Sequence, residues 1–478
     1  MKLKKIILPI MATFALLSSN LTAQAVNVVQ VPASEVKSVY NQSVDSNGIE
    51  GWARGPHIYS EAGIVMDIDS GAILYAKNID NPHYPASITK ILTGLVALEN
   101  NELTETVTIT PEDYSFLKRG DNHIGLKNGE IISMEDALHG TLLASGNEVA
   151  HALGSNTEGG YENFLVLMNE KAKELGCKNS HFTNSHGLHD KDHYTSARDM
   201  ALIGAAAFKN EDFRRITRTK LYTIPTTNVT DETRSFENHH KMLFDWRSQY
   251  YEYCVGGKTG YTDNALNTLV TFATKDDVNL VSVVLRTHGS GNTYVDTRAM
   301  MDYAFDKFAK VPVTLNMVDA TGLESIAENA YVMLPEGITF DQLESTVETP
   351  TELGVRTGSI SYTYHGQPVG KITTTITEDY HNELHGIEKQ EATNPESPKP
   401  ESPKKEKPSA IIIVIRVIIW VILIVAILFL LLLCFVTYKR WQIQKRRKAR
   451  RRKLKREREY QRYLEHMQTD DFKDEENF

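Results

Sequence analysis

Ser87 and Lys90 stand three residues apart, and their side chains could act together in a reaction. Apolar residues follow at helical spacing from Ile91 to Leu98, and residues three apart on a helix share one face. A lysine amine can take the proton of a serine hydroxyl if burial or a nearby positive charge keeps the amine neutral part of the time. A helix start also favours the negative charge that develops on an attacked carbonyl. One turn could therefore supply a nucleophile, a base and part of an oxyanion hole, although solvated helix starts often show the same spacing.

Ser145 and Asn147 form a second polar pair, between an apolar run that ends at Ala144 and a helical pattern from Glu148 to Leu153. On a connection between two helices, a hydroxyl can relay a proton and an amide can hold a substrate amide. Taken alone, the pair is explained better by an ordinary interhelical turn with a capping residue.

A third motif, Lys258-Thr259-Gly260, precedes an expected strand over Leu266–Ala273. A lysine beside a hydroxyl on a strand edge can bind a carboxylate. Small residues around it allow a peptide to lie against the backbone. This motif, too, is common by itself.

The three motifs in this order, about 55 and then about 110 residues apart, resemble the signature of the penicillin-recognising serine acyltransferases. The resemblance covers roughly residues 62–376. Residues 183–190 and 193–201 are similar to the Asn-x-His-Gly-Leu and Ser-Ala-Arg-Asp-Met-Ala segments of D-alanyl-D-alanine carboxypeptidases of the S11 peptidase family, the low-molecular-weight penicillin-binding proteins. A class A β-lactamase is disfavoured because its Glu-x-x-Leu-Asn segment is missing at the expected place.

The resemblance implies the following reaction. Ser87 attacks the carbonyl between the two D-alanines that end a peptidoglycan stem peptide, with Lys90 as general base. Ser145 passes a proton to the leaving amine, and water then hydrolyses the acyl-enzyme. β-Lactams, which carry a carboxylate and a strained amide in a similar layout, are expected to acylate the same serine.

The resemblance also implies a set of substrate-binding residues. Asn147 positions the peptide, and Lys258 with Thr259 binds the terminal carboxylate. Gly260 lets the peptide approach the strand, and the backbone N–H groups of Ser87 and Tyr261 form the oxyanion hole.

The elements that must position these residues predict an α+β fold. Residues 63–67 and 72–76 flank the turn 69–71 as a hairpin, and residues 266–273 and 278–286 form another. Between them, Ser133 and Asp136 predict a capping box that opens a helix, and a helical pattern from Phe164 ends near Gly176. The expected architecture is a penicillin-binding/β-lactamase-like transpeptidase domain with an antiparallel sheet and a helical region.

The exported chain divides further by composition. We expect an N-terminal extension over residues 26–55, the catalytic domain over 56–310 and a small, mostly β domain over 311–386, where short strands such as 361–364 and 371–376 alternate. Residues 387–409 are rich in Pro, Lys and Glu and predict an extended stalk.

Both ends of the chain predict export and membrane attachment. Residues 1–25 have the basic start, apolar run and small-x-small end of a signal peptide. Residues 410–438 are nearly all apolar and long enough to form a transmembrane helix, with Arg416 close enough to its start to reach the headgroups. The basic tail, 439–478, is then cytoplasmic, and the catalytic domain faces the cell wall of a single-pass membrane protein.

Other function classes fit less well. The net charge of -9 hides a basic block after the apolar run, and this block faces lipid headgroups rather than nucleic acid. Four histidines, His181, His186, His189 and His193, invite a metal interpretation, but Gly187 breaks any common helical face, so neither a metal nor another cofactor is expected. Cys177 and Cys254 could pair, although two buried thiols fit better.

Two alternatives to a carboxypeptidase stay open. A D,D-transpeptidase would transfer the acyl group to an amine instead of water. A β-lactam-binding sensor would signal inward through the membrane helix and tail without turnover.

Overall fold

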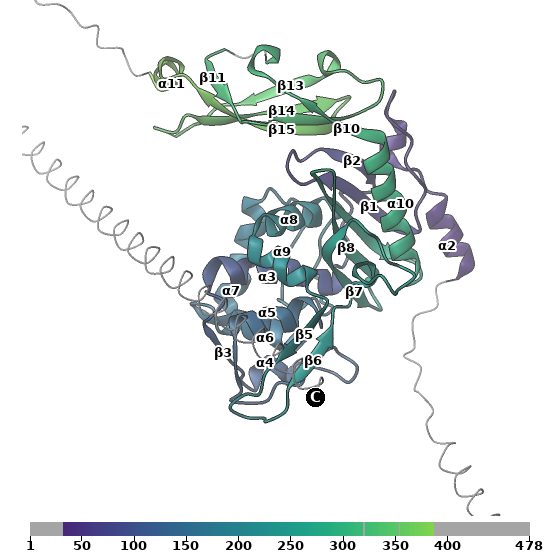
Figure 1. The fold of residues 1–478 in the computed structure, drawn as a ribbon, viewed down its shortest axis with the longest axis vertical. Helices are drawn as coiled ribbons and strands as arrows, with labels where there is room; N and C mark the ends of the chain where they lie inside the picture. The colour runs from purple at the N-terminus through teal and green to yellow at the C-terminus, as the bar shows by residue number, and fades with distance from the viewer. Residues whose placement is uncertain (1–31, 319–320, 353, 387–478) are drawn as a thin grey trace, which may run out of the picture. The chain divides into compact units, whose positions relative to one another are not determined.

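The computed structural model describes residues 32–318, 321–352 and 354–386 (Figure 1). The predicted signal peptide (1–25), stalk (387–409), transmembrane helix (410–438) and cytoplasmic tail (439–478) lie outside these residues. Within the described part of the chain, no helix is both long enough and apolar enough to cross a membrane.

An antiparallel sheet of five strands, in the order β2-β1-β9-β8-β7, forms the frame of the fold. Its strands are β1 (Ser60–Asp67), β2 (Ile73–Lys77), β7 (Cys254–Thr262), β8 (Leu266–Lys275) and β9 (Val278–Thr287). The two predicted hairpins are therefore confirmed as β1–β2 and β8–β9. In β1, Ile64 and Met66 belong to one hydrophobic cluster and Val65 to another. Because successive side chains of a strand point to opposite faces, both faces of the sheet are buried.

Helices cover the two faces (Figure 1). On one face, α10 (Asn292–Lys307) packs through Met300 and Ala304. On the other, α8 (Ala197–Lys209) packs through Met200 and Ala201. The sheet is thus the middle layer of this part of the molecule. Its edge strand β7 pairs with β8 on one side and with no strand of the sheet on the other.

The helical region lies on the α8 side of the sheet (Figure 1). It comprises α3 (Lys90–Asn100), α4 (Glu112–Ser115), α5 (Met134–Leu142), α6 (Asn147–Ser155), α7 (Gly160–Glu174) and α9 (Glu211–Arg218). Two small hairpins join it: β3 (Thr106–Thr108) with β4 (Ile131–Ser133), and β5 (Leu221–Ile224) with β6 (Arg234–Glu237). The predicted capping box of Ser133 and Asp136 opens α5. Every residue of α3 from Lys90 to Ala97 is buried, as expected of a helix that is largely apolar on all sides.

The C-terminal strands follow α10. They are β10 (Phe308–Pro312), β11 (Leu323–Ile326), β12 (Tyr331–Pro335), β13 (Glu344–Glu348), β14 (Thr357–Tyr364) and β15 (Gln367–Ile376), and the short helix α11 (Glu378–Leu384) ends the described chain. Four of them form a sheet in the order β11-β15-β14-β13, and β10 pairs with β12.

These strands bind directly to the first hairpin of the central sheet. Lys371 N donates to Ser70 O at 2.8 Å, and Tyr331 Oη donates to Asp67 Oδ1 at 2.8 Å. Val332 and Ile372 share a hydrophobic cluster with residues of the central sheet. The mostly β character predicted for residues 311–386 is present, and the described residues all belong to one compact unit. The domain boundary at residue 310 stays a prediction.

The N-terminal segment packs against the opposite end of the same hairpin. It contains α2 (Ala33–Tyr40) and the 3-10 turn η1 (Asp45–Gly48). The buried Lys77 amine donates to Val39 O at 2.9 Å and to Ser60 O at 2.9 Å, so it ties α2 to β1. Cys177 and Cys254 are both free thiols.

Candidate active site

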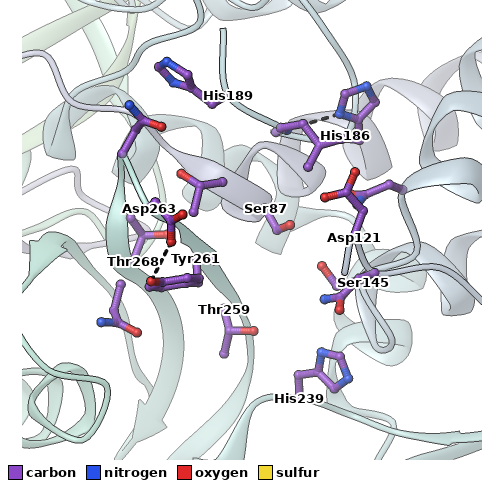
Figure 2. A pocket seen from close by; sticks show the side chains of 18 of the residues that line it. Ser87, Asp121, Ser145, His186, His189, His239, Thr259, Tyr261, Asp263 and Thr268 are labelled. Atoms are coloured by element: carbon purple, nitrogen blue, oxygen red, sulfur yellow. Dashed lines mark hydrogen bonds between the residues drawn. The ribbon is translucent and has the colours of Figure 1, made fainter. Parts of the chain in front are cut away.

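Ser87 lies in the 3-10 turn η2 (Ala86–Thr89), and Lys90 is the first residue of α3. The predicted juxtaposition is present, with Lys90 Nζ 3.0 Å from Ser87 Oγ. The difference from the prediction is that the serine sits in a tight turn before the helix. Ala86 has a φ of 53°, a conformation that costs a non-glycine residue energy and that often occurs at functional sites. This turn directs Ser87 into the cleft (Figure 2).

Lys90 is fully buried and lies at the centre of the site. Besides Ser87, its amine donates to Asn147 Oδ1 at 2.7 Å and to His186 O at 2.5 Å. Burial, and next the charge of Lys258, lower the pKa of Lys90 well below its usual value, while Glu148 and Asp121 oppose this shift. A lysine with a lowered pKa can be neutral and can accept a proton from a neighbouring hydroxyl.

Ser145 lies in the connection between α5 and α6, as predicted, and Asn147 is the first residue of α6. Ser145 has a φ of 62°, in the left-handed region. Its Oγ is buried and makes no hydrogen bond to any described residue. A strained backbone that holds an unpartnered hydroxyl beside a cleft is typical of a functional position.

Lys258, Thr259, Gly260 and Tyr261 lie on β7, the edge strand of the central sheet. The Lys258 side chain is 1% exposed, and burial lowers its pKa to about 7. A Cβ at Gly260 would lie 2.3 Å from Thr268 Oγ1 and 3.0 Å from Ser87 N. Only glycine therefore fits where β7 passes the serine.

A cleft of about 1090 Å³ brings most of the predicted residues together. It is lined by Ser87, Ser145, Asn147, Thr259, Gly260 and Tyr261. Figure 2 shows Ser87 between the β7 side, with Thr259 and Tyr261, and the helical side, with Ser145. Lys90 and Lys258 do not line the cleft, because both amines lie buried behind its surface.

The cleft also contains residues to which the sequence analysis gave no role. Four are Asp121, His239, Asp263 and Thr268 (Figure 2). Tyr261 Oη donates to Asp263 Oδ1 at 3.0 Å, and Asp263 could have been suspected from its position just after the Lys-Thr-Gly strand. Asp121 and His239 lie outside helices and strands, so no periodicity pointed to them.

The segment around Gly187 forms another wall of the cleft. Gly187 has a φ of 83°, and a Cβ there would lie 2.0 Å from Ala86 O. The backbone of this segment therefore presses directly against the turn that carries Ser87.

The four clustered histidines have separate partners. His193 Nε2 lies 2.8 Å from Thr89 Oγ1, and His181 Nδ1 lies 2.7 Å from Asp192 O. His186 Nδ1 accepts from Leu188 N, and His189 packs edge-on against Tyr84. These contacts give each imidazole a role in fixing its own loop.

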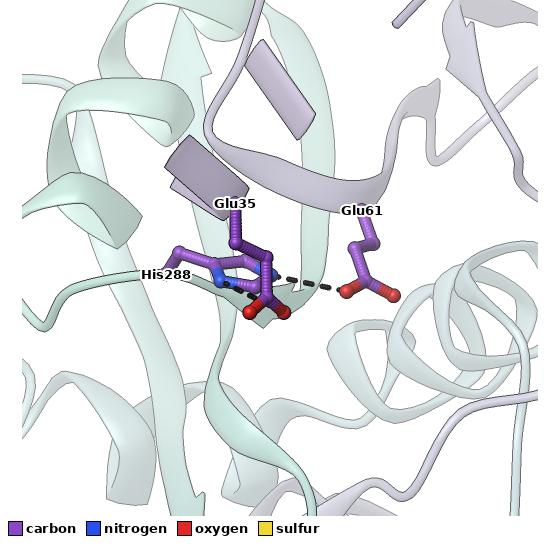
Figure 3. A group of neighbouring side chains, drawn as sticks. All are labelled: Glu35, Glu61 and His288. Carbon is purple, nitrogen blue, oxygen red and sulfur yellow. Dashed lines mark hydrogen bonds and ion pairs between the residues drawn. The ribbon is translucent and has the colours of Figure 1, made fainter. Parts of the chain in front are cut away.

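A different group, Glu35, Glu61 and His288, has the residue types of a metal site (Figure 3). His288 Nε2 lies 3.0 Å from Glu61 Oε1, which also accepts from Arg286 Nε at 2.8 Å, and His288 Nδ1 lies 3.9 Å from Glu35 Oε1. The arginine already supplies a positive charge to Glu61. We therefore interpret the group as an ion-paired contact that holds α2 against β1 and the end of β9.

Comparison with known proteins identifies the family. The model of the D-alanyl-D-alanine carboxypeptidase family, peptidase S11, matches residues 50–289. D-alanyl-D-alanine carboxypeptidase DacF of Bacillus subtilis is 30% identical over 257 residues, which are 53% of this chain and 64% of that protein. DacA of Haemophilus influenzae is 27% identical over 70% of this chain and 89% of its own length.

A solved structure shows the same fold. The crystal structure of the Streptomyces K15 DD-transpeptidase matches 53% of this chain and 100% of its own chain, with 28% identity and a TM-score of 0.50. The predicted penicillin-binding-like α+β fold is thereby confirmed. With its matched motifs gathered in and directly behind the wall of one cleft, the chain belongs to the D-alanyl-D-alanine carboxypeptidase family, peptidase S11.

Proposed function

We propose that this protein is a serine-type D-alanyl-D-alanine carboxypeptidase that removes the terminal D-alanine from peptidoglycan stem peptides through an acyl-enzyme on Ser87. One observation carries the proposal. The buried Lys90 amine, with its lowered pKa, lies 3.0 Å from the Ser87 hydroxyl at the wall of a large cleft. A hydroxyl in this position can be activated without a histidine.

In the first half of the reaction, Ser87 Oγ attacks the carbonyl carbon of the penultimate D-alanine, and Lys90 Nζ accepts the hydroxyl proton. The negative charge on the carbonyl oxygen is stabilised by the backbone N–H groups of Ser87 and Tyr261. The C–N bond then breaks, and the proton held by Lys90 passes through Ser145 to the leaving amine, which returns Lys90 to its neutral form. The Ser145 hydroxyl has no hydrogen bond to a described residue, which supports such a relay.

Substrate binding follows from the remaining polar groups. Asn147 Oδ1 is already used by Lys90, so its NH2 group is left to donate to a carbonyl of the peptide. Lys258 and Thr259 bind the terminal carboxylate, which gives the buried Lys258 amine a negatively charged partner. In the second half, water attacks the ester with Lys90 again as base, and the shortened peptide leaves.

The test is release of free D-alanine from a peptide that ends in D-Ala-D-Ala, together with covalent labelling by a fluorescent penicillin. Ser87→Ala should abolish both signals. Ser235→Ala, which changes an exposed serine of β6, should keep both near the parent level. Mapping of the penicillin adduct to another residue, or undiminished labelling of Ser87→Ala, would remove Ser87 from the proposal.

A D,D-transpeptidase is the second candidate, because the matched crystal structure carries that name. Both activities share the acyl-enzyme and differ in its acceptor. An assay with a D-amino acid beside the donor peptide separates them, since a transpeptidase forms the exchanged peptide at the expense of hydrolysis. If β-lactam labels the protein but no D-alanine is released, the sensor alternative is favoured instead.

We also propose that the catalytic part faces the cell wall while residues 439–478 lie in the cytoplasm. The apolar run 410–438 and the basic residues after it support this arrangement. Protease treatment of intact protoplasts, from which the cell wall has been removed, should degrade the catalytic part and leave the cytoplasmic tail protected. Recovery of the full-length chain in the soluble fraction would argue against it.

A further inference from the structure

Glu148 is a buried carboxylate beside Asn147, and the reaction above gives it no role. It is 1% exposed. Its Oε1 accepts the backbone N–H groups of Ile124 at 2.6 Å and Gly125 at 3.0 Å. Its Oε2 is also buried and has no hydrogen-bond partner among the described residues. Burying a half-satisfied carboxylate costs free energy, so the position needs a physical explanation.

The segment that Glu148 holds forms a wall of the cleft. Residues 116–130 contain no helix or strand, yet residues 116 and 118–122 line the cleft. Asn147 N donates to Asn122 O at 2.9 Å, next to the two N–H groups held by Glu148. Two consecutive residues of α6 therefore hold this segment, and hydrogen bonds to a charged acceptor are the stronger kind.

Glu148 in its ionised form also acts electrostatically on Lys90. Burial raises the pKa of Glu148, and the backbone N–H of Ile124 opposes this shift by favouring the carboxylate. Burial and the charge of Lys258 lower the pKa of Lys90, and Glu148 is the first of the two carboxylates, with Asp121, that raise it. Of the charged groups that act on the base, Lys258 comes from β7, Glu148 from α6 and Asp121 from the 116–130 segment. Three imidazoles also feel the charge of Lys90, which adds to burial in lowering the pKa of each: His186, His193 and His239. The charge balance at Lys90 thus depends on the residue that also fixes the cleft wall.

We propose that Glu148 is a positioning residue for this reaction, which holds the segment that carries the cleft-lining residues 118–122 against α6 and adds a negative charge next to Asn147, whose Oδ1 accepts from Lys90. The inference rests on the proposed carboxypeptidase function. It gives one side chain two separable effects: the hydrogen bonds need only an acceptor at Oε1, whereas the electrostatic effect needs a full negative charge.

Glu148→Gln separates these effects, because glutamine has a side chain of the same length that keeps an acceptor oxygen and loses the negative charge. With the charge gone, the pKa of Lys90 falls further, so the neutral base persists to lower pH. We expect the acid limb of kcat/KM for D-alanine release, and that of penicillin acylation, to move to lower pH while KM stays close to the parent value. Superimposable profiles for Glu148→Gln and the parent would overturn the electrostatic part.

Glu148→Ala removes the acceptor as well. We expect kcat/KM to fall by about 10- to 100-fold, mainly through KM, because the wall that contacts substrate is no longer fixed. Glu162→Gln is the matched control, since Glu162 lies in the first turn of α7 but is exposed and outside the cleft, and it should behave like the parent. An unchanged KM in Glu148→Ala would overturn the positioning part.

Hydrogen exchange gives a readout that does not depend on catalysis. The amides of Ile124 and Gly125 should stay protected in the parent and Glu148→Gln and lose protection in Glu148→Ala. If that pattern appears while the parent protein neither releases D-alanine nor reacts with penicillin, the proposed function fails and the contact stands. If all three proteins protect these amides equally, the positioning inference fails even in an active enzyme.

Discussion

Gly187→Ala tests how closely the wall of the cleft must fit the turn that carries Ser87. Gly187 has a φ of 83°, and a Cβ there would lie 2.0 Å from Ala86 O, 2.5 Å from Ala86 C and 3.0 Å from Ser87 N. All three atoms belong to the backbone, so no side chain can rotate away. Either the 184–188 segment or the η2 turn must shift.

Two costs add up. The left-handed conformation costs a non-glycine residue about 1–2 kcal/mol. Forcing a methyl group into a filled space costs about 1–3 kcal/mol more, because the surrounding backbone must move. A shift of about 1 Å at the reacting group lowers a rate by about 100-fold. We therefore expect Gly187→Ala to lose about 100-fold in the rate of penicillin acylation, beyond its loss of stability.

Gly71→Ala is the matched control. Gly71 has nearly the same φ, 72°, but a Cβ there would meet nothing within 4 Å, and it lies outside the cleft. It should lose stability in denaturant unfolding through the left-handed conformation alone and acylate at the parent rate. If folded Gly187→Ala acylates within about threefold of Gly71→Ala, the contact between this wall and the Ser87 turn does not position the nucleophile.

Three further variants probe the base, the core and a helix cap. Lys258→Met removes the positive charge that helps to lower the pKa of Lys90, so the acid limb of penicillin acylation should move to higher pH, opposite to the shift expected for Glu148→Gln. Phe213→Ala, at a position with no exposure that packs against Phe272, should lower the free energy of unfolding by about 3–5 kcal/mol in urea titrations. Ser133→Ala removes the capping box of α5 and should cost about 1 kcal/mol in the same titrations.

The sequence predicted the features that depend on a few neighbouring residues, such as turns and helix caps. The turn at residues 69–71 joins β1 to β2, and a capping serine opens α5, because each depends on a few neighbouring residues. The Ser87–Lys90 contact follows from their spacing, even though the serine lies in a 3-10 turn rather than in the helix.

The sequence could not predict contacts between elements that are far apart in the chain. β1 pairs with β9, so Ser60 lies opposite Thr287 although most of the described sequence separates them. No turn joins these two strands, so no local signal predicts that they pair. The same holds for Gly260, whose need for glycine comes from Ser87 N and Thr268 on other elements. The left-handed φ of Ser145 could not be predicted either, since serine does not favour that conformation by itself.

Three buried lysines show why the site suits a substrate with a free carboxylate. Lys77, Lys90 and Lys258 are all at most 1% exposed. Lys77 donates to three carbonyl groups. Burial lowers its pKa to about 8, and the charges of Asp296 and Glu61 oppose this shift.

Lys258 is paired with no carboxylate among the described residues and donates only to Thr259 O, and burial lowers its pKa to about 7. Its ammonium form is therefore left without a negative partner in the described part of the chain. In the proposed reaction, a peptide carboxylate beside Thr259 would supply a negative charge, and the paired Lys258 would then depress the pKa of Lys90 less. On this proposal, substrate binding and the strength of the base are coupled through one buried charge, that of Lys258.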